Sequence, residues 1–412
     1  MERRLKVLIS AYACEPGKGS EPEVGWQWAT QMARYHDVTV LTRANNEAAI
    51  DAELKKHSHD WAPRFAYFDL KPAFQRFKKR FGMHNAYYSL WQRAASRVIA
   101  DLVKRERFDL LHHVTYAGAR YPTAVLRHGV PSIFGPVGGL ESMTPGFLPW
   151  RHPGMLAEEL ARNAGNLWQE WGPSLKRKLT SATVVVASTP ETQEAFARLG
   201  VESRLLPAIG LNCGEFAEHE GKEKEAGHPL RLLFAGRLLY WKGVDLALRA
   251  LAQSKTEATL TLVGDGKYLP ALRDLARELH LEKQVEFCGQ KTRGEVLRIY
   301  RDHDAFLYPS LHDSGGFTLI EAMASGLPPI CLDCGGPGLA VTSESGLKIG
   351  LGRRSHVIGK LAEAIDQYAA DPGLRVRHGQ QARERIRAEY DWSKKAEKMD
   401  LWYREAVGTK DK

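Results

Sequence analysis

Short apolar runs typical of buried β-strands alternate with amphipathic helical patterns along the whole sequence. The strand-like runs fall at residues 6–10, 37–42, 110–114, 132–135, 183–187, 231–235, 259–263, 285–288, 305–308 and 329–332. Helical patterns separate them at residues 24–34, 86–107, 244–252, 268–279, 295–301, 318–324 and 357–370. Strands that alternate with helices build parallel sheets covered by helices on both faces. The pattern therefore predicts an α/β chain with two doubly wound domains.

The junction between the two domains is predicted at residues 206–212, where a turn-forming segment follows the last strand of the first half. The first domain would then comprise residues 1–209 and the second would begin at residue 210. Ligands of doubly wound sheets bind beyond the carboxyl ends of the strands. Two such domains facing each other would create a deep cleft, which is where we expect the functional site.

The composition is that of an ordinary globular protein, with 412 residues, 43% hydrophobic and 26% charged. It excludes disordered, collagen-like and coiled-coil proteins. No stretch reaches the roughly 18 to 20 apolar residues of a membrane-spanning helix. Residues 6–10 are interpreted as a first buried strand, although their basic and apolar flanks imitate a signal peptide. Five scattered cysteines favour a reducing compartment, so we expect a cytoplasmic protein.

Positive charge is concentrated in the first half of the chain. The net charge is +9, and the first 210 residues hold 28 Lys and Arg against 20 Asp and Glu. Residues 71–100 contain seven cations and no acid. The aromatic residues of this segment are Phe74, Phe77, Phe81, Tyr87, Tyr88 and Trp91.

A basic and aromatic helical segment suits the surface of an anionic membrane. Residues 71–100 could equally form a helix pair whose aromatic rings fill the core and whose cations face water. Nucleic acid is not expected as a partner, because no recognition motif accompanies the basic composition.

A possible anion site follows the strand at residues 231–235. Gly236 and Arg237 open a loop that ends at Lys242 and Gly243 and leads into a helix. Glycine lets the backbone approach a ligand, while Arg supplies a fork of donors and Lys a compact charge. This arrangement suits a diphosphate, although a solvated loop would also explain it.

A sharper feature follows the strand at residues 305–308. Asp313 lies in a loop, Gly315 and Gly316 open a helix, and Glu321 falls about one turn inside it. Free N–H groups at a helix start bind phosphate or sugar oxygens. Because Glu321 has apolar neighbours on both sides, an unpaired carboxylate there would be costly to bury. Two vicinal hydroxyls, as on a ribose, would satisfy it; the alternative is an exposed helical Glu.

The sequence resembles a known family in these segments. GRLLYWKGVDLALRAL, LVGDG and YPSLHDSGGFTLIEAMASGLP are similar to the retaining GT-B glycosyltransferases of family 4, the glycosyl transferases group 1. The resemblance is strong over residues 230–347. It implies two Rossmann-like domains facing across a cleft, with a nucleotide-sugar domain at residues 210–390 and a terminal helix at 391–412 that packs back on the first domain.

The resemblance also implies roles for individual residues. Glu321 would bind ribose hydroxyls, Asp313 the donor sugar, and Arg237 with Lys242 the diphosphate. In the family the first acid is usually Glu, so Asp313 leaves the donor sugar open. The further residues expected to contact the donor are Gly17, Gly19, Ser20, Gly236, Gly315, Gly316, Phe317 and Thr318.

The activity implied is transfer of a sugar from a UDP- or GDP-linked donor to a hydroxyl of a glycan or lipid-linked acceptor, with retention of configuration. A role in cell-surface polysaccharide or glycolipid synthesis at the inner face of the membrane would follow. The alternatives are a non-catalytic nucleotide-sugar binder, or an epimerase or phosphorylase on the same scaffold. No metal or other cofactor is expected, because the Asp302–Asp304 pair precedes a strand and is interpreted as a helix end.

The acceptor side is predicted in the first domain. His113 ends a strand and is our choice for an acceptor contact. Because neighbouring strand residues face opposite ways, we expect at most one of His112 and His113 to point into the cleft. The glycine loop with Gly138, Gly139 and Glu141 follows another strand and is expected at the same mouth. A structural histidine and a simple tight turn are the alternatives.

Overall fold

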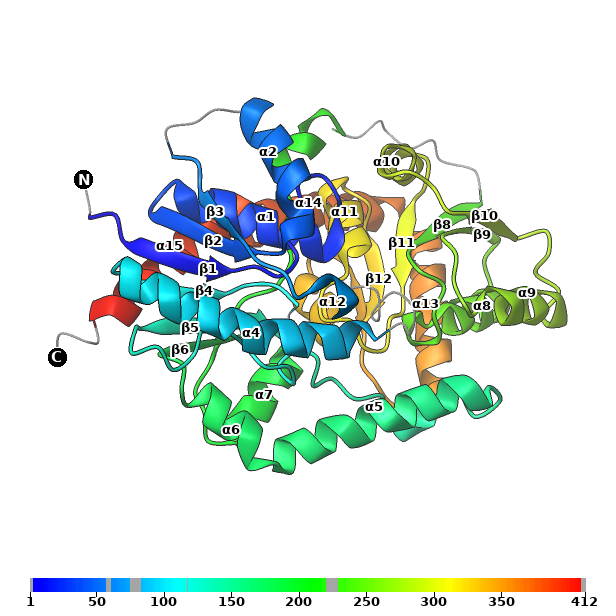
Figure 1. Ribbon diagram of the computed structural model, residues 1–412. Helices are drawn as coiled ribbons and strands as arrows, with labels where there is room; N and C mark the ends of the chain where they lie inside the picture. The colour runs from blue at the N-terminus through cyan, green and yellow to red at the C-terminus, as the bar shows by residue number, and fades with distance from the viewer. Residues whose placement is uncertain (1–2, 57–60, 75–82, 117, 220–228, 409–412) are drawn as a thin grey trace. The chain divides into compact units, whose positions relative to one another are not determined.

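The computed structural model describes residues 3–56, 61–74, 83–116, 118–219 and 229–408. The chain divides into two compact units. Unit 1 comprises Met1–Leu140, Asn166–Ile209 and Trp392–Lys412, and unit 2 comprises Glu141–Gly165 and Gly210–Asp391. Each unit is built on its own parallel sheet (Figure 1).

Unit 1 contains a 7-stranded parallel sheet with the order β3-β2-β1-β4-β5-β6-β7. Its strands are β1 (Lys6–Ser10), β2 (Asp37–Thr42), β3 (Arg64–Tyr67), β4 (Leu110–His113), β5 (Ser132–Val137), β6 (Val184–Ala187) and β7 (Arg204–Leu205). The central strands are buried almost throughout, because helices cover both faces. The order reverses between β1 and β4, and ligands bind at such switch points.

The helices of unit 1 connect its strands as crossovers, except for the terminal helix. They are α1 (Ser20–Ala33), α2 (Glu47–Lys56), α4 (His84–Arg105), α6 (Pro173–Leu179), α7 (Pro190–Arg198) and α15 (Trp392–Gly408). The terminal helix α15 packs on α1, where Trp28 and Trp392 meet edge to face at 5.4 Å. Tyr403 of α15 contacts His112 of β4 through a 2.6 Å hydrogen bond.

Unit 2 repeats the design with a 6-stranded parallel sheet of order β10-β9-β8-β11-β12-β13. Its strands are β8 (Leu230–Ala235), β9 (Ala258–Val263), β10 (Val285–Gly289), β11 (Ala305–Tyr308), β12 (Pro329–Leu332) and β13 (Leu347–Ile349). Its helices are α8 (Val244–Gln253), α9 (Leu269–Glu278), α10 (Arg293–Arg301), α11 (Phe317–Ala324), α12 (Gly335–Ala340), α13 (Arg354–Ala370) and α14 (Pro372–Glu389). The carboxyl ends of β8 and β11 lie side by side, because the two strands pair directly.

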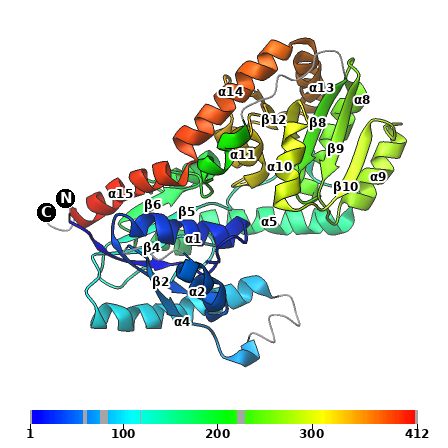
Figure 2. The same cartoon turned by 90° about the horizontal axis from the view of Figure 1, so that it is seen from above.

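The structure confirms the two doubly wound sheets and all ten strand-like runs, with small differences at their ends. Three edge strands, β3, β7 and β13, were not predicted because they are short and only half buried. One difference in domain organisation is larger. Residues Glu141–Gly165 belong to unit 2, so the chain leaves unit 1 and returns within the long helix α5 (Pro153–Trp171), which Figure 2 shows as one continuous rod.

The basic and aromatic segment 71–100 forms part of the core in the residues that are described. Tyr87, Tyr88 and Trp91 on α4 are buried, and they pack against Tyr12 of the β1 loop. Phe74 remains half exposed. Phe77 and Phe81 lie outside the described residues. The core interpretation is therefore correct for three of the six aromatic rings. Among the described helices, none is long and apolar enough to span a bilayer.

Candidate active site

The loops after β8 and β11 are joined to each other in unit 2. The Thr318 hydroxyl donates a 2.7 Å hydrogen bond to the carbonyl oxygen of Ala235, at the end of β8. Gly243 adopts a left-handed φ of 67°, and a Cβ atom there would lie 2.0 Å from the carbonyl oxygen of Pro309. Glycine is therefore required at position 243, and the close approach fixes the start of α8 against the β11 loop.

Lys242, Tyr308 and Asp313 form a compact polar cluster where these loops meet. The Lys242 ammonium group pairs with the Asp313 carboxylate and donates a 2.6 Å hydrogen bond to the Tyr308 hydroxyl. That hydroxyl donates in turn to Oδ2 of Asp313, also at 2.6 Å. Burial alone would raise the pKa of Asp313, but the Lys242 charge and these hydrogen bonds hold the pKa below its ordinary value. The cluster therefore contains an ionised pair at neutral pH.

The start of α11 presents backbone N–H groups beside this cluster. Gly316 precedes the helix with a left-handed φ of 87°, and no side chain caps the helix start. The N–H of Gly315 contacts Oδ1 of Asp313 at 3.4 Å. Phe317 and Thr318 occupy the first turn, whose N–H groups have no intrahelical partner. An uncapped helix start of this kind favours binding of an anion.

Glu321 lies in the second turn of α11 and is largely buried, with 12% of its side chain exposed. Only ribose hydroxyls were considered from the sequence as partners for this carboxylate, whereas the structure also provides a protein partner. Arg293, the first residue of α10, donates from Nε to Oε1 of Glu321 at 3.0 Å and also contacts Glu215 at 2.7 Å. Burial raises the pKa of Glu321, and Arg293 opposes this rise. Within the described part of the chain, Oε2 has no hydrogen-bond partner.

Arg237 lies in the loop after β8 and is exposed. Its guanidinium group has no hydrogen bond or ion pair among the described residues. The preceding Gly236 has a φ of 151°, and the backbone of Gly264 approaches so closely that a Cβ there would lie 1.9 Å from the Gly236 oxygen. The loop is thus held by backbone packing, while its one guanidinium group is available to a ligand.

A second buried network surrounds His312, the residue before Asp313, and the sequence did not reveal it. His312 lies in the same loop, stacks on Trp241 at 5.5 Å, and contacts the Glu159 carboxylate at 3.2 Å. Arg162 contacts Nδ1 of His312 at 2.7 Å. Burial lowers the pKa of His312. Glu159 and Arg162 both lie in the segment 153–171, for which no role was predicted from the sequence.

The predicted glycine loop of unit 1 does precede α1. Gly17 and Gly19 have left-handed φ values of 68° and 69°, and a Cβ atom at either position would contact nothing within 4 Å. Ser20 also has a positive φ, 53°, which is uncommon for a residue with a side chain. The N–H of Gly17 is held by Oε2 of Glu23 at 2.7 Å. These contacts define an exposed loop, while its role toward a donor stays a prediction.

His113 is buried at the end of β4, with 2% of its surface exposed. Its Nδ1 lies 3.1 Å from the Thr123 hydroxyl, and its ring packs against Phe134. Burial lowers the pKa of His113 to about 3, so the ring is neutral at physiological pH. The neighbouring His112 points to the opposite face, as expected. An acceptor contact for His113 stays a prediction.

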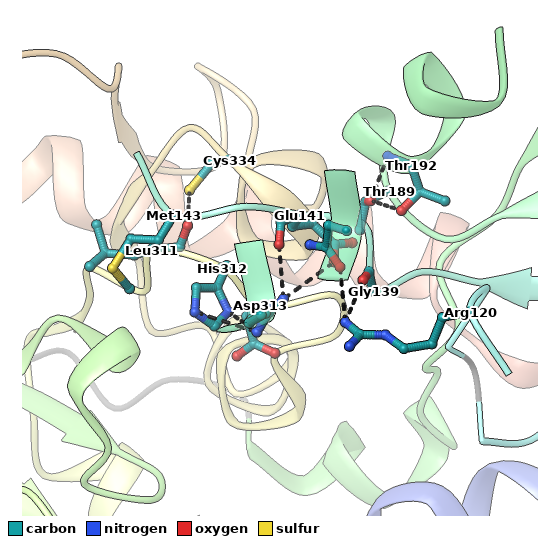
Figure 3. A network of polar contacts seen from close by, with 12 residues as sticks. Arg120, Gly139, Glu141, Met143, Thr189, Thr192, Leu311, His312, Asp313 and Cys334 are labelled. Carbon is teal, nitrogen blue, oxygen red and sulfur yellow. Dashed lines mark hydrogen bonds and ion pairs between the residues drawn. The ribbon is translucent and has the colours of Figure 1, made fainter. Parts of the chain in front are cut away.

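The loop after β5 is held by polar contacts within each unit. In unit 1, Gly138 pairs with Gly118, and Arg120 donates a 3.1 Å hydrogen bond to the carbonyl oxygen of Gly139 (Figure 3). In unit 2, Glu141 is buried, and Arg162 donates to its carbonyl oxygen at 3.0 Å. The predicted acceptor role of these residues is not tested by their geometry.

Asp302 and Asp304 both have structural roles in unit 2. Asp302 caps the end of α10, and Asp304 is buried and accepts a 2.9 Å hydrogen bond from the N–H of Arg231. No group of three His, Cys, Asp or Glu side chains suited to a metal occurs within the described residues.

Comparisons with known proteins match both halves of the chain. Residues 215–385 match the family described as glycosyl transferases group 1, and residues 18–208 match the glycosyl transferase 4-like domain. The glycogen synthase of Mycobacterium tuberculosis is 32% identical over 167 residues, which are 40% of each chain. The D-inositol 3-phosphate glycosyltransferase of Corynebacterium glutamicum is 29% identical over 47% of this chain and 48% of its own length. The chain thus spans less than half the length of these two relatives.

Solved structures share the architecture. Sucrose-phosphate synthase from Thermosynechococcus elongatus superposes with a TM-score of 0.66 at 20% identity, over 99% of this chain and 100% of its own. Anabaena HepE in complex with UDP superposes with a TM-score of 0.63 at 18% identity, over 97% and 100%. At these identities the likeness concerns the fold. Together with the two family matches, it shows that the chain belongs to the group 1 glycosyltransferases of GT-B architecture.

Proposed function

We propose that this protein is a retaining, metal-independent glycosyltransferase that moves a sugar from a UDP- or GDP-linked donor to a hydroxyl of a glycan or lipid-linked acceptor. The observation that carries the proposal is the cluster of Lys242, Tyr308 and Asp313 beside the uncapped start of α11. The UDP and UDP-glucose complexes of Anabaena HepE, which has the same fold, support a nucleotide-sugar donor.

The donor would be held by three kinds of contact. Glu321 accepts hydrogen bonds from the ribose hydroxyls through Oε2, while Arg293 occupies Oε1 and keeps the carboxylate oriented. Arg237 and Lys242 bind the diphosphate, together with the N–H groups at the start of α11. Asp313 accepts a hydroxyl of the donor sugar. Because Asp313 already neutralises Lys242, the binding of an anionic diphosphate requires the Lys242 ammonium group to be shared between the two.

The reaction exchanges two bonds at the anomeric carbon. The bond to the diphosphate oxygen breaks, and a bond to the acceptor oxygen forms on the same face of the sugar ring. The acceptor proton passes to the departing phosphate oxygen, so no protein nucleophile is required. Negative charge grows on the diphosphate in the transition state, where fixed cations and helix N–H groups stabilise it. Arg237, Lys242 and the start of α11 supply this stabilisation.

The test is an assay of nucleotide diphosphate release and of glycosylated product over a panel of UDP- and GDP-sugars and acceptors. Glu321→Ala should weaken donor binding at least about tenfold, the equivalent of about 1.4 kcal/mol. Lys242→Ala should lower kcat about 10²- to 10³-fold through loss of transition-state stabilisation. Glu363→Ala and Lys360→Ala, an exposed pair on α13, are the matched controls. Parental transfer rates in both site variants would refute the proposal.

The same assay distinguishes the alternatives. A non-catalytic binder would bind the donor without turnover across the acceptor panel. An epimerase would convert one nucleotide sugar to another without releasing nucleotide. A phosphorylase would depend on inorganic phosphate.

We also propose that the protein works in the cytoplasm, peripherally at an anionic membrane, in synthesis of a cell-surface polysaccharide or glycolipid. Since Tyr87, Tyr88 and Trp91 are core residues, the cations of segment 71–100 rather than these three rings would attract the surface. An exposed aromatic pair is available on α5, where Trp168 and Trp171 are 76% and 86% exposed. Tryptophan is favoured at the membrane–water interface.

Co-sedimentation with vesicles containing phosphatidylglycerol tests the membrane contact. Replacing the seven cations of segment 71–100 with Gln should abolish salt-sensitive binding. Trp168→Ala/Trp171→Ala should weaken binding at all salt concentrations, whereas Trp150→Ala, at another exposed tryptophan, should not. Failure of the parental protein to bind these vesicles at low salt would refute the membrane proposal.

A further inference from the structure

Unit 2 contains a cavity of about 670 Å³ that is separate from the predicted donor contacts. Its walls come from the loop at residues 146–152, from the first turns of α8 and α13, and from α9 along its length to Glu278. Neither Arg237, Lys242, Asp313 nor Glu321 lines it. The volume falls within the roughly 300 to 1,000 Å³ of small-molecule sites. The cavity therefore has the size of a binding site.

The floor of the cavity is held in place by hydrogen bonds and ring contacts. Arg354 pairs with the buried Asp245 and donates a 3.1 Å hydrogen bond to the Tyr240 hydroxyl. That hydroxyl donates to the carbonyl oxygen of Phe147 at 2.5 Å. Tyr268 meets the Tyr240 ring edge to face at 5.2 Å. The floor is thus assembled before any ligand arrives, which lowers the cost of binding.

Three further groups at the cavity are available to a ligand. Trp150 is 65% exposed, although its backbone is held by a 2.9 Å hydrogen bond to Leu148, which is itself buried. Arg249 on α8 and Glu278 on α9 line the cavity, and neither has an ion pair within the described part of the chain. The cavity thus presents the flat indole ring of Trp150, the N–H donors of the Arg249 guanidinium group and the Glu278 carboxylate.

The balance of charge identifies the class of ligand. Three arginines, Arg151, Arg249 and Arg354, line the cavity together with three carboxylates, Asp245, Asp274 and Glu278. Asp245 is paired with Arg354 and Asp274 with Arg277, so charges of both signs, on Arg151, Arg249 and Glu278, are left to meet a ligand. A phosphate or a polyanion would meet the carboxylates, and a cation would meet the arginines. A neutral sugar fits both, because each hydroxyl can donate to a carboxylate and accept from a guanidinium group. The apolar C–H face of a sugar ring suits the indole of Trp150.

We propose that this cavity binds a neutral oligosaccharide, apart from the donor. It would hold a segment of glycan chain on unit 2 while transfer takes place elsewhere. The proposal rests on the proposed function in one respect: the glycan would be the acceptor or product of the transfer. Binding of an oligosaccharide in the cavity can be measured without any transfer.

Titration calorimetry and saturation-transfer NMR with maltohexaose, cellohexaose and mannohexaose test the proposal, with hyaluronan hexasaccharide and inorganic phosphate as anionic probes. At least one neutral oligosaccharide should bind. Trp150→Ala and Glu278→Gln should each weaken that binding about tenfold or more. Trp168→Ala, at an exposed tryptophan outside the cavity, should leave it unchanged.

Binding of UDP and GDP to the Trp150→Ala variant separates this proposal from the proposed function. Parental nucleotide affinity together with lost oligosaccharide binding is the expected result. Three results would overturn the proposal: no neutral probe binds at millimolar concentration, binding survives both cavity substitutions, or an anionic probe binds in preference. If the parental protein binds neither UDP nor GDP, the proposed function is overturned, but the oligosaccharide proposal is not. Because the Trp150 side chain is exposed, its removal should leave the melting temperature unchanged.

Discussion

Removing the ammonium group of Lys242 should destabilise unit 2 at neutral pH, because Asp313 then loses its countercharge. The two side chains are 12% and 18% exposed, so the pair is mostly shielded from water. Breaking a fully buried pair costs about 3–5 kcal/mol, and a hydrogen bond to a charged group contributes about 1.5–3 kcal/mol. With the residual exposure, we expect about 2–3 kcal/mol for Lys242→Ala. A unit of this size should melt roughly 5–10 °C lower.

The stability difference between Lys242→Ala and the parental protein should depend on pH, and the pKa of Asp313 determines the direction of this dependence. In the parental protein the pKa of folded Asp313 lies below the ordinary value of 3.8, so its stabilising contribution is present at neutral pH and is lost as pH falls toward the folded pKa. In Lys242→Ala, burial raises that pKa above the unfolded value. The deficit of the variant is therefore largest near pH 7 and shrinks on acidification.

Differential scanning calorimetry of the parental protein, Lys242→Ala and Lys242→Ala/Asp313→Asn measures these effects. The double variant should recover part of the lost stability, because no charge is then left unpaired. Equal melting temperatures of Lys242→Ala and the parental protein at pH 7, or a deficit that grows on acidification, would refute the reasoning.

Three further predictions concern single positions. Arg293→Ala should raise the pKa of Glu321 and weaken donor binding in calorimetric titrations, while stability changes by less than about 1 kcal/mol because Arg293 is half exposed. His113 has a pKa of about 3, so rate profiles of the parental protein and His113→Gln should have the same shape between about pH 5 and 8; a step lost in the variant would contradict this. Gly243→Ala should cost more than about 2 kcal/mol in thermal unfolding, whereas Gly359→Ala, in open space on α13, should stabilise by up to about 1 kcal/mol.

The central strands could be predicted because burial on both faces leaves a continuous apolar run, as in β1 and β11. The edge strands could not, since one side of each faces water and the pattern weakens; β3 reads as Arg-Phe-Ala-Tyr and is nowhere fully buried. Helix α5 was not predicted, and its position depends on contacts such as Glu159 with His312, 153 residues apart. Local periodicity carries no information about such pairs.

The same distinction applies to the site. The glycine-opened helix and the loop with Lys242 follow from local turn and helix chemistry, and the structure brings Lys242 to Asp313. The partner of Glu321 was missed because Arg293 lies on α10, 28 residues away. One local signal could have indicated it: Thr292 and Glu295 form a capping box, which places Arg293 at the first turn of a helix.

A crystal structure of the protein with bound UDP or GDP is the most direct measurement of where the donor lies. We expect the ribose hydroxyls within hydrogen-bond distance of the Glu321 carboxylate, and the diphosphate between Arg237, Lys242 and the start of α11. A nucleotide bound away from α11, with Glu321 still contacting only Arg293, would contradict the donor site on which the proposed glycosyl transfer depends.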